Sequence, residues 1–490
     1  MSFELADILA EDDKKQVPKG LHVTGIRAQS SHVAPGEAFF ALPGTRVHGN
    51  QFIADAVENG AAMIVTDHKP DIEPVVPVVV VEDVRAAYAR AAASLFAPQP
   101  EISAAVTGTS GKTSVVNFLR QFWAHAGIKA ASVGTLGVIV EGEEMMGGST
   151  GDLTTPDALD LHHQLRNLKT LYDVDHVALE ASSHGLDQRR LDGLAFDAVG
   201  FTNLSHEHLD YHGEMAAYRD AKMRLFRDLL KEGGTAVVNC DDAEHPPFMF
   251  AALERGATLM TVGREGAHFE VGEVIREGFG QRVTGKLVGE DVSFHLPLTG
   301  EFQVSNAVVA GAMAMATGVE KEAMIEGMSA LRGAKGRLEH VADHNGGGIF
   351  VDYSHKPAAL QSALESLRPY VDGRLIVVFG AGGDRDKGKR PIMGQIATQL
   401  ADAVIVTDDN PRSEDPAEIR KEILAEAPAA REVGDRADAI ALGIGDMRKG
   451  DVLLIAGKGH EDYQIVGSTK HHFSDHEVVA QAVSAQRAAG

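Results

Sequence analysis

Short apolar runs recur along the chain, and most of them end in a polar or glycine-rich loop that leads into a helix-like stretch. Near the N-terminus the runs are "EAFFAL" (37–42), "AAMIVTD" (61–67) and "VVPVVVVED" (75–83), and the helix-like "QFIADAVENG" (51–60) separates the first two. The pattern continues through "HVALEASSHG" (176–185), "AVGFTNLS" (198–205) and "TAVVNCDD" (235–242). Such alternation is typical of parallel α/β sheets, which bind ligands at the carboxyl ends of their strands.

Two breaks divide this pattern into three predicted domains. The prolines of "SLFAPQP" (94–100) indicate a linker before the strand, loop and helix of "EISAAVTGTSGKTS" (101–114). A third series of strands starts near "GAKGRLEHV" (333–341) and includes "GIFVDYSHKP" (348–357) and "DVLLIAGKGHEDYQ" (451–464). We therefore predict a small N-terminal α/β domain at 1–98, a central P-loop ATPase-like domain with a parallel sheet at 99–333, and a C-terminal Rossmann-like domain at 334–490.

The amino-acid composition argues against several classes of protein. The 490 residues are 44% hydrophobic, enough for several cores, and the net charge of −24 provides no field that would attract nucleic acid or an anionic membrane. The N-terminal "MSFELADILAEDDKKQ" lacks a basic n-region and a long apolar core, and no run of about 18 apolar residues appears elsewhere, so we expect a soluble, unexported protein. The single cysteine, Cys240, excludes an internal disulfide, as expected in a reducing cytoplasm.

A phosphate-binding loop is predicted between the first central strand and its helix. Its residues, in "TGTSGKTS" (107–114), are Gly108, Thr109, Ser110, Gly111, Lys112, Thr113 and Ser114. The glycines let backbone N–H groups approach a polyphosphate, Lys112 reaches the terminal phosphates, and Thr113 can ligate Mg²⁺. Val106 stands where a standard P-loop has glycine, so this is a shortened G-x-x-G-K-T form.

Metal ligation is a second candidate chemistry. "NLSHEHLDYH" (203–212) concentrates histidines and acids, but Asp210 occupies the place of the second histidine in a zinc H-E-x-x-H motif. A solvated polar loop is the alternative interpretation. Glu180, at the end of another predicted strand, is a hard oxygen ligand suited to Mg²⁺. "FGAGGDR" (379–385) is rejected as a dinucleotide fingerprint because Arg385 replaces its third glycine.

Ten motifs in order resemble the ATP-dependent Mur ligases of peptidoglycan synthesis. They are "GTSGKT", "EASSHGLDQRR", "HEHLDYHG", "AYRDAK", "SNAVVA", "GRLE", "VDYSHKP", "GGDRDKGKRP", "DDNPR" and "AGKGHEDYQ". The last three are similar to the members that add diaminopimelate. The resemblance implies a cytoplasmic, monomeric ligase that joins diaminopimelate to the D-Glu side-chain carboxylate of UDP-MurNAc-L-Ala-D-Glu through an acyl phosphate, using ATP and two Mg²⁺ ions.

The resemblance also implies residue roles. The catalytic set is Lys112, Glu180, His208 and Lys222, with Thr113, Glu180, His208 and a CO₂-derived carbamate on Lys222 as metal ligands. The nucleotide would contact the phosphate loop, Asn306, Arg337, Asp352 and His355. The UDP-sugar dipeptide would contact Ser30, Leu153, Thr154, Thr155, Ser182, Gln188 and Arg190, so the N-terminal domain is expected to bind the UDP-MurNAc group. Diaminopimelate would contact Arg385, Asp409, Asn410, Pro411, Arg412, Gly457 and Glu461.

The turn "DDNPR" (408–412) has a physical rationale of its own. Arg412 offers a bidentate fork for the distal carboxylate of diaminopimelate, while Asp409 and Asn410 can orient the groups around it. Glu461 is expected to meet the distal ammonium. Lysine lacks that carboxylate, so a site built around Arg412 is expected to reject it.

Two positions depart from the family pattern, and two other functions remain as alternatives. Gln29-Ser30-Ser31 replaces Asp-Ser-Arg, and Leu153 replaces an asparagine.

One alternative function is that of a ligase similar to folylpolyglutamate synthetase, which lacks the N-terminal domain and the "DNPR" turn. The other is a nucleotide-switched P-loop binding protein, which would not need Glu180, His208 and Lys222 together.

Overall fold

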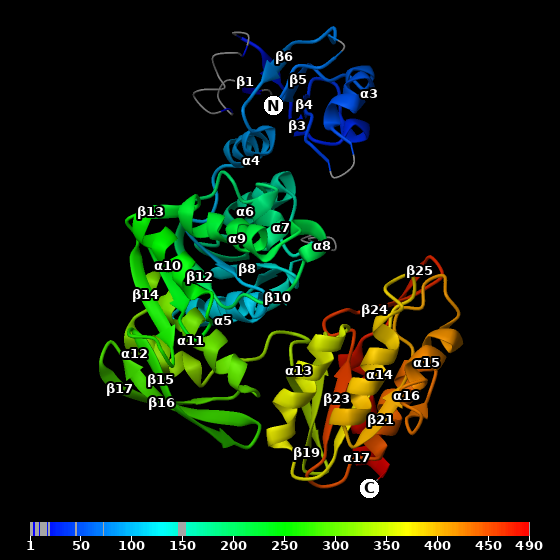
Figure 1. Ribbon diagram of the computed structural model, residues 1–490. Coiled ribbons are helices and arrows are strands. Elements are labelled where there is room, and N and C mark those ends of the chain that lie inside the picture. The colour runs from blue at the N-terminus through cyan, green and yellow to red at the C-terminus, as the bar shows by residue number, and fades with distance from the viewer. Residues whose placement is uncertain are drawn as a thin grey trace. The chain divides into compact units, whose positions relative to one another are not determined.

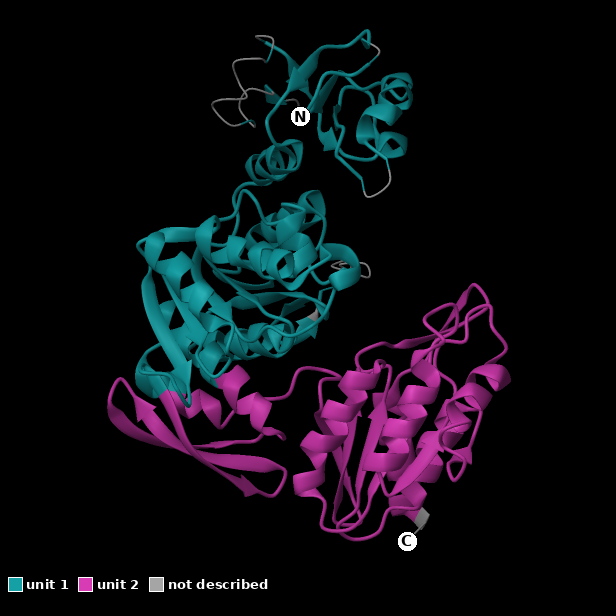
Figure 2. Cartoon of the chain, in the orientation of Figure 1, with its two compact units in different colours: residues 1–269, 308–324 teal, residues 270–307, 325–490 magenta. Residues whose placement is uncertain are grey.

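The computed structural model describes residues 3–4, 9, 17, 20–44, 47–71, 73–145 and 153–489. Two compact units make up the chain (Figure 2): Met1–Phe269 with Val308–Met324, and Glu270–Ala307 with Ile325–Gly490. Among the described residues, no helix has the length and apolarity needed to cross a membrane.

The N-terminal part of the first unit is a four-stranded parallel sheet with short helices (Figure 1). Its strands lie in the order β3 (Ile26–Arg27), β4 (Ala38–Phe40), β5 (Met63–Thr66) and β6 (Val78–Val80), beside a separate antiparallel pair, β1 (Phe3–Glu4) and β2 (His22–Val23). The helices are η1 (Ser30–His32), η2 (Gly49–Phe52), α3 (Ile53–Glu58) and α4 (Val84–Leu95). Asp83 caps α4 by accepting a hydrogen bond from the Ala86 N–H, so the polar residue after β6 starts the helix.

The rest of the first unit is built on a larger, mostly parallel sheet. Its strands lie in the order β10 (Glu143–Glu144), β9 (Gly137–Val140), β8 (Ala130–Gly134), β11 (His176–Glu180), β7 (Ile102–Thr107), β12 (Phe196–Phe201), β13 (Leu230–Asn239) and β14 (Thr258–Gly263). Its helices are α5 (Lys112–His125), α6 (Ala158–Tyr172), α7 (Ser183–Asp187), α8 (Leu209–His212), α9 (Met215–Arg227) and α10 (His245–Glu254). β7 lies between β11 and β12, so the loops after these three strands meet at one edge.

The second unit contains an antiparallel segment and a parallel sheet. The segment consists of β15 (Phe269–Glu277), β16 (Gly280–Leu287) and β17 (Glu290–Leu296). The sheet order is β18 (Glu339–His344), β19 (Gly347–Asp352), β23 (Val452–Ala456), β20 (Leu375–Phe379), β21 (Ala403–Val406) and β22 (Arg431–Glu432), and only β18 is antiparallel. The hairpin β24 (Tyr463–Val466) and β25 (Thr469–His472) follows β23.

Helices cover both faces of this second sheet, as in a doubly wound fold. They are α13 (Pro357–Leu367), η3 (Arg368–Tyr370), α14 (Lys389–Leu400), α15 (Pro416–Leu424), α16 (Arg436–Gly445) and α17 (Asp475–Ala489). One core packs α13, α14 and α15 on the sheet, and a second core packs α16 and α17. The residue ranges of the two units meet within α11 (Glu301–Ala316) and α12 (Lys321–Met328). The predicted α/β class with parallel sheets is confirmed.

Candidate active site

The phosphate loop joins β7 to α5, as the sequence predicts. Gly108 (φ 152°) lies so close to β12 that a Cβ atom there would be 2.0 Å from Thr202 Oγ1, and Gly111 (φ 88°) starts α5 in a left-handed conformation. Asn203 holds the loop from the next strand, because its backbone oxygen accepts from the Thr109 N–H at 2.8 Å and its Oδ1 from the Ser110 N–H at 3.0 Å. These two hydrogen bonds hold the loop in its phosphate-binding shape.

Lys112 and Thr113 extend from this loop at the start of α5. Lys112 Nζ donates to the carbonyl oxygens of Gly108 and Thr109, both at 2.8 Å. Thr113 is buried, and its hydroxyl donates to Glu180 Oε2 at 3.1 Å. Ser114 is buried in the same first turn.

Glu180 is the centre of the site in the first unit. It ends β11 and is 2% exposed. Besides Thr113, Thr135 reaches its carboxylate twice, through the backbone N–H (2.8 Å) and the hydroxyl (3.2 Å). Gly134 allows this approach, because a Cβ atom there would lie 2.2 Å from Glu180 Oε1. These donors fix the position of the Glu180 carboxyl group beside Thr113, an arrangement of oxygen ligands that suits a Mg²⁺ site.

The residues expected to hold the sugar dipeptide gather around the same strand end. Thr155 Oγ1 donates to the backbone oxygen of Glu180 (2.7 Å) and lies 2.9 Å from Ser182 Oγ. Arg190 donates to the Thr155 carbonyl oxygen and to Gln188 Oε1, both at 2.7 Å. Thr154 belongs to the same group, because its Oγ1 atom lies 3.3 Å from Thr135 Oγ1. Leu153, where the family pattern has asparagine, is 42% exposed.

His208 and Lys222 both lie near the ring of Tyr218. His208 has a left-handed backbone (φ 56°) at the start of α8, and its ring centroid is 6.2 Å from that of Tyr218. Lys222 Nζ is 4.6 Å from the Tyr218 ring centroid, and the Tyr218 hydroxyl is 3.1 Å from Thr109 Oγ1. Tyr218, which sequence reasoning did not single out, thus links both residues to the phosphate loop.

Lys222 is buried beneath that loop. Its side chain on α9 is 1% exposed, and Nζ donates to the Gly108 carbonyl oxygen at 2.7 Å. Burial, and then the positive charge of Lys112, lower the pKa of Lys222 well below its usual value. Its amine is therefore easier to deprotonate than that of an exposed lysine.

Three of the nucleotide residues predicted in the second unit lie next to Tyr353, in the sequence or in space: Arg337, Asp352 and His355. The Arg337 guanidinium carbon lies 4.9 Å from the Tyr353 ring centroid, and the rings of His355 and His460 lie 4.5 and 5.0 Å from it. Asp352 Oδ2 accepts from the Leu338 N–H at 2.7 Å, and burial raises the pKa of this carboxyl. Burial also lowers the pKa of His460 to about 4, so its ring is neutral. Asn306 is buried on α11, where it donates to Gln303 Oε1.

The "DDNPR" turn follows β21 and is ordered by three neighbouring segments. Arg412 has φ 52°, its N–H donates to the Ile465 carbonyl oxygen (3.0 Å), and its Nη1 donates to that of Gly383 (2.9 Å). Asn410 Nδ2 donates to Glu461 Oε2 at 3.0 Å. Pro411 packs against the loop after β20, because a Cβ atom on Gly383 would be 1.9 Å from its carbonyl oxygen.

The other residues expected to contact the amino acid lie around this turn. Gly457 (φ 122°) ends β23, and a Cβ atom there would lie 3.1 Å from Asp409 Oδ2. Asp409 is buried, and its pKa is lowered because Lys458 and Arg436 outweigh the effect of burial. Arg385 is exposed on the loop after β20. The structure thus brings the predicted set together at the carboxyl ends of β20, β21 and β23.

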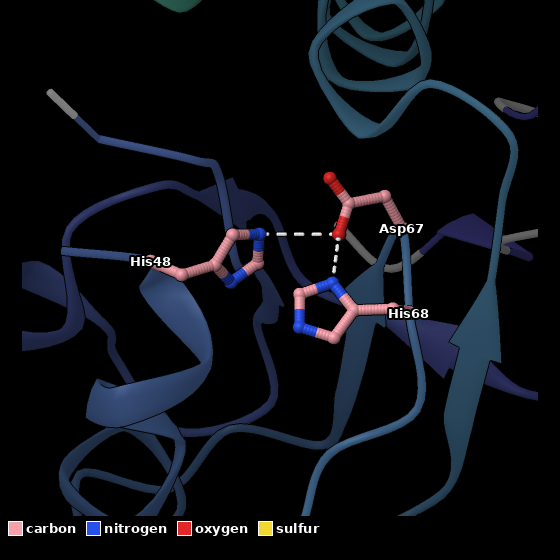
Figure 3. A group of neighbouring side chains, drawn as sticks. All are labelled: His48, Asp67 and His68. Carbon is pink, nitrogen blue, oxygen red and sulfur yellow. Dashed lines mark hydrogen bonds and ion pairs between the residues drawn. The ribbon is translucent and has the colours of Figure 1, made fainter.

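Ser30 lies in η1 of the N-terminal part of the first unit, where its backbone oxygen accepts from Asn59 Nδ2 at 3.0 Å. The same part carries a group with metal-ligand chemistry, His48, Asp67 and His68 (Figure 3). Asp67 Oδ1 is 3.1 Å from His48 Nε2 and 2.6 Å from His68 Nδ1.

Hydrogen bonds from Asn50 explain this group without a metal ion. The Asn50 N–H donates to His48 Nδ1, and Asn50 Nδ2 lies 3.1 Å from His68 Nε2. Each ring therefore carries its proton on the nitrogen that faces Asp67, where a metal would need a lone pair. The group braces the loop before η2.

Comparison with known proteins agrees with this geometry. Sequence models match at residues 22–103 (Mur ligase family, catalytic domain), 106–314 (Mur ligase middle domain) and 336–459 (Mur ligase, glutamate ligase domain). A curated protein of Bradyrhizobium diazoefficiens, named UDP-N-acetylmuramoyl-L-alanyl-D-glutamate--2,6-diaminopimelate ligase, is 50% identical over 99% of this chain and 100% of its own length. The chain belongs to the Mur ligase family.

Solved structures extend the comparison. A structure titled UDP-N-acetylmuramoyl-L-alanyl-D-glutamate--2,6-diaminopimelate ligase matches this Mur ligase with a TM-score of 0.72 and 31% identity, covering 99% of this chain and 100% of the other. A Mycobacterium tuberculosis folylpolyglutamate synthase matches with a TM-score of 0.59 and 20% identity, covering 75% of this chain and 90% of the other. The second likeness shows a common fold alone.

Proposed function

We propose that this Mur ligase adds diaminopimelate to the D-Glu side-chain carboxylate of UDP-MurNAc-L-Ala-D-Glu, with hydrolysis of ATP to ADP and phosphate. The relatives that carry this name match the chain over its full length. The structural observation that carries the proposal is the continuous hydrogen-bonded set from Thr113, at the end of the phosphate loop, through Glu180 to Thr155 and Arg190. It joins a phosphate loop directly to the residues expected to hold the acceptor carboxylate.

The chemistry runs in two steps. A carboxylate oxygen of the D-Glu side chain attacks the γ-phosphorus of ATP, and ADP leaves, which gives an acyl phosphate. The amine of diaminopimelate then attacks the acyl carbon, loses a proton, and expels phosphate that keeps the original carboxylate oxygen. Positioning and charge neutralisation supply most of the catalysis in phosphoryl transfer.

The residues of the first unit divide this work. Lys112 and the loop N–H groups would bind the β- and γ-phosphates, and Thr155, Ser182, Gln188 and Arg190 would hold the dipeptide. Thr113, Glu180, His208 and a carbamate on Lys222 would hold two Mg²⁺ ions, which neutralise phosphate charge when bound. The remaining nucleotide contacts would come from residues of the second unit, namely Asn306, Arg337, Asp352 and His355.

The carbamate proposal rests on the position of Lys222. A lysine ammonium cannot ligate a cation, whereas a carbamate offers two anionic oxygens. Its side chain is buried and lies against the Gly108 carbonyl oxygen, beside the loop that binds phosphate. A buried amine with a lowered pKa is also more often in the neutral form that attacks CO₂.

The proposal also includes the domain boundaries 98/99 and 333/334, which follow from the breaks in the sequence pattern. The resemblance implies that the N-terminal domain with Ser30 would bind the UDP-MurNAc group and that the enzyme would act as a monomer. The single cysteine, Cys240, is in keeping with a reaction in the reducing cytoplasm.

The test is phosphate release by the purified protein with ATP, Mg²⁺, UDP-MurNAc-L-Ala-D-Glu and a panel of amino acids. We expect release only when the UDP-sugar dipeptide and diaminopimelate are both present, and none with Lys112→Ala, which loses its charge on the phosphates. Equal release without the UDP-sugar would favour a nucleotide-switched protein, and release with a folate and glutamate would favour the folylpolyglutamate alternative.

A further inference from the structure

Lys458 is a buried cation beside the proposed amino-acid site, and the reaction scheme above does not use it. Its side chain is 0% exposed in the loop after β23. Nζ donates to Asn410 Oδ1 at 3.0 Å and to the Tyr463 carbonyl oxygen at 2.7 Å. It also lies 3.4 Å from Asp409 Oδ1 and 3.9 Å from Glu461 Oε2. The lysine therefore touches three residues of the proposed diaminopimelate set.

One consequence is a fixed orientation of the Asn410 amide. Asn410 Oδ1 accepts from Lys458 Nζ and from the Ile465 N–H (2.9 Å). With two donors on its oxygen, the amide must present Nδ2 on the other side, where it donates to Glu461 Oε2. Lys458 thus sets which groups Asn410 and Glu461 offer to a ligand.

A second consequence concerns charge. Asp409 and Glu461 both lie beside Lys458, and Arg436, a second cation near Asp409, is paired through two 2.7 Å bonds with Asp475. In this group of five side chains, three carboxylates meet two cations, which leaves one negative charge. That charge suits a ligand ammonium, and a fully neutralised cluster would not attract one.

We infer that Lys458 is a positioning residue that sets the affinity of the site for the distal ammonium of diaminopimelate, by orienting Asn410 and by keeping Asp409 and Glu461 ionised together. The inference rests on the proposed function, because it takes the "DDNPR" turn as the amino-acid site. Under this inference the site recognises two groups of the ligand. Arg412 is expected to bind the distal carboxylate, and the cluster around Lys458 binds the distal ammonium.

Loss of Lys458 would make the cluster take up a proton. The charged and titratable groups that act on Asp409, Glu461 or Lys458 are Arg436, Asp475, His355, Arg412, Lys389 and Tyr353. Lys458 lowers the pKa of both carboxyls, and burial and Asp409 already raise the pKa of Glu461. Without the lysine, the two acids would share a proton at neutral pH and release it as the pH rises.

The decisive experiment compares KM values of Lys458→Met and wild-type enzyme for diaminopimelate at about pH 6.5 and about pH 8.5. In Lys458→Met we expect KM at the lower pH to rise roughly tenfold or more, and to recover partly at the higher pH as the shared proton is lost. Wild-type KM should change much less, and KM values for ATP and for the UDP-sugar should stay near normal. Lys421→Met, which removes a lysine paired with Glu418 on the surface of α15, is the matched control and should behave as wild type.

A substrate analogue and a second variant separate this role from simple damage. 2-Aminopimelate lacks the distal ammonium, so its KM should change little in Lys458→Met. The double variant Lys458→Met/Glu461→Gln keeps only Asp409 ionised and should lose the pH dependence. If Lys458→Met does not fold, Glu461→Gln alone provides the test, because it should weaken diaminopimelate by roughly tenfold and leave 2-aminopimelate unchanged.

In Lys458→Met, an equal rise in KM for diaminopimelate and for 2-aminopimelate would overturn the inference, and so would an equal rise in the diaminopimelate KM at both pH values. The ligase proposal would stand in either case. A wild-type enzyme that adds no diaminopimelate would instead overturn the proposed function itself.

Discussion

Lys222 Nζ donates a 2.7 Å hydrogen bond to the carbonyl oxygen of Gly108, the first glycine of the phosphate loop. The contact brings a buried lysine of α9 to the base of the loop that is expected to hold ATP. A cation in this place would repel Mg²⁺, whereas a carbamate at the same nitrogen would attract it. The relationship is therefore the structural basis for testing modification of Lys222.

Lys222→Ala is predicted to abolish ligation and to be partly rescued by short carboxylic acids, because a small carboxylate can occupy the space vacated by the carbamate. The assay is diaminopimelate-dependent phosphate release across a series of acetate and formate concentrations. Lys129→Ala, which removes a half-exposed lysine paired with Asp173, is the control and should keep normal activity. Absence of rescue, together with an unmodified Lys222 in a crystal structure grown with bicarbonate, would count against the carbamate.

Gly134→Ala is predicted to reduce kcat by about a hundredfold or more with only a modest loss of stability. Its new Cβ atom would meet Glu180 Oε1 at 2.2 Å, so the carboxylate must move away from Thr113. Gly333→Ala is the control, because the nearest atom to its Cβ would be 3.8 Å away. Steady-state kinetics and thermal unfolding of both variants would check this, and near-normal kcat in folded Gly134→Ala would mean that the position of Glu180 is not critical.

Local sequence patterns predict the phosphate loop and the α/β class, because each depends on neighbouring residues. The glycines, lysine and threonine of the loop all lie within the short stretch 108–113, and apolar runs with polar ends identify the parallel strands. The same logic places Glu180 and the "DDNPR" turn at strand ends, where the structure has them.

Contacts between residues that are far apart in the sequence could not be predicted from local patterns. Tyr218 and Thr135 have side chains found in any helix or loop, and only the fold brings them to Lys222 and Glu180. Lys458 is a single charge in a polar loop, where a solvated role is the more common one, and its burial becomes visible only with the hairpin β24–β25 in place. The left-handed backbone of Arg412 likewise has no sequence signal, since glycine and asparagine are the residues that favour it.

Arg412→Ala is predicted to raise the KM for diaminopimelate by roughly a hundredfold or more while changing kcat less, because the variant lacks the cation for the distal carboxylate. The Gly383 carbonyl oxygen that now accepts from Arg412 Nη1 would remain available to water, so the turn should keep its shape. Exposed Arg487→Ala on α17 is the control. A normal KM in Arg412→Ala, or efficient use of lysine by wild type, would contradict the specificity assigned to this turn.

Asp475→Asn is predicted to destabilise the second unit by about 3–5 kcal/mol, since it leaves the buried Arg436 guanidinium without its carboxylate. Both side chains are 0% exposed. The measurement is the free energy of unfolding in urea, monitored by far-UV circular dichroism. Asp372→Asn breaks the exposed pair with Arg276 and should cost less than about 1 kcal/mol, so similar losses in the two variants would contradict the importance of burial.

In the proposed reaction, ATP phosphorylates the D-Glu side-chain carboxylate of UDP-MurNAc-L-Ala-D-Glu, and the amine of diaminopimelate then attacks the acyl phosphate. The most direct measurement uses this substrate with ¹⁸O in the D-Glu side-chain carboxylate and analyses the released phosphate and the peptide product by mass spectrometry. We predict one ¹⁸O atom in each phosphate and a product enlarged by one diaminopimelate residue, with neither formed when diaminopimelate is replaced by lysine. Unlabelled phosphate, or phosphate release without the peptide product, would contradict the account.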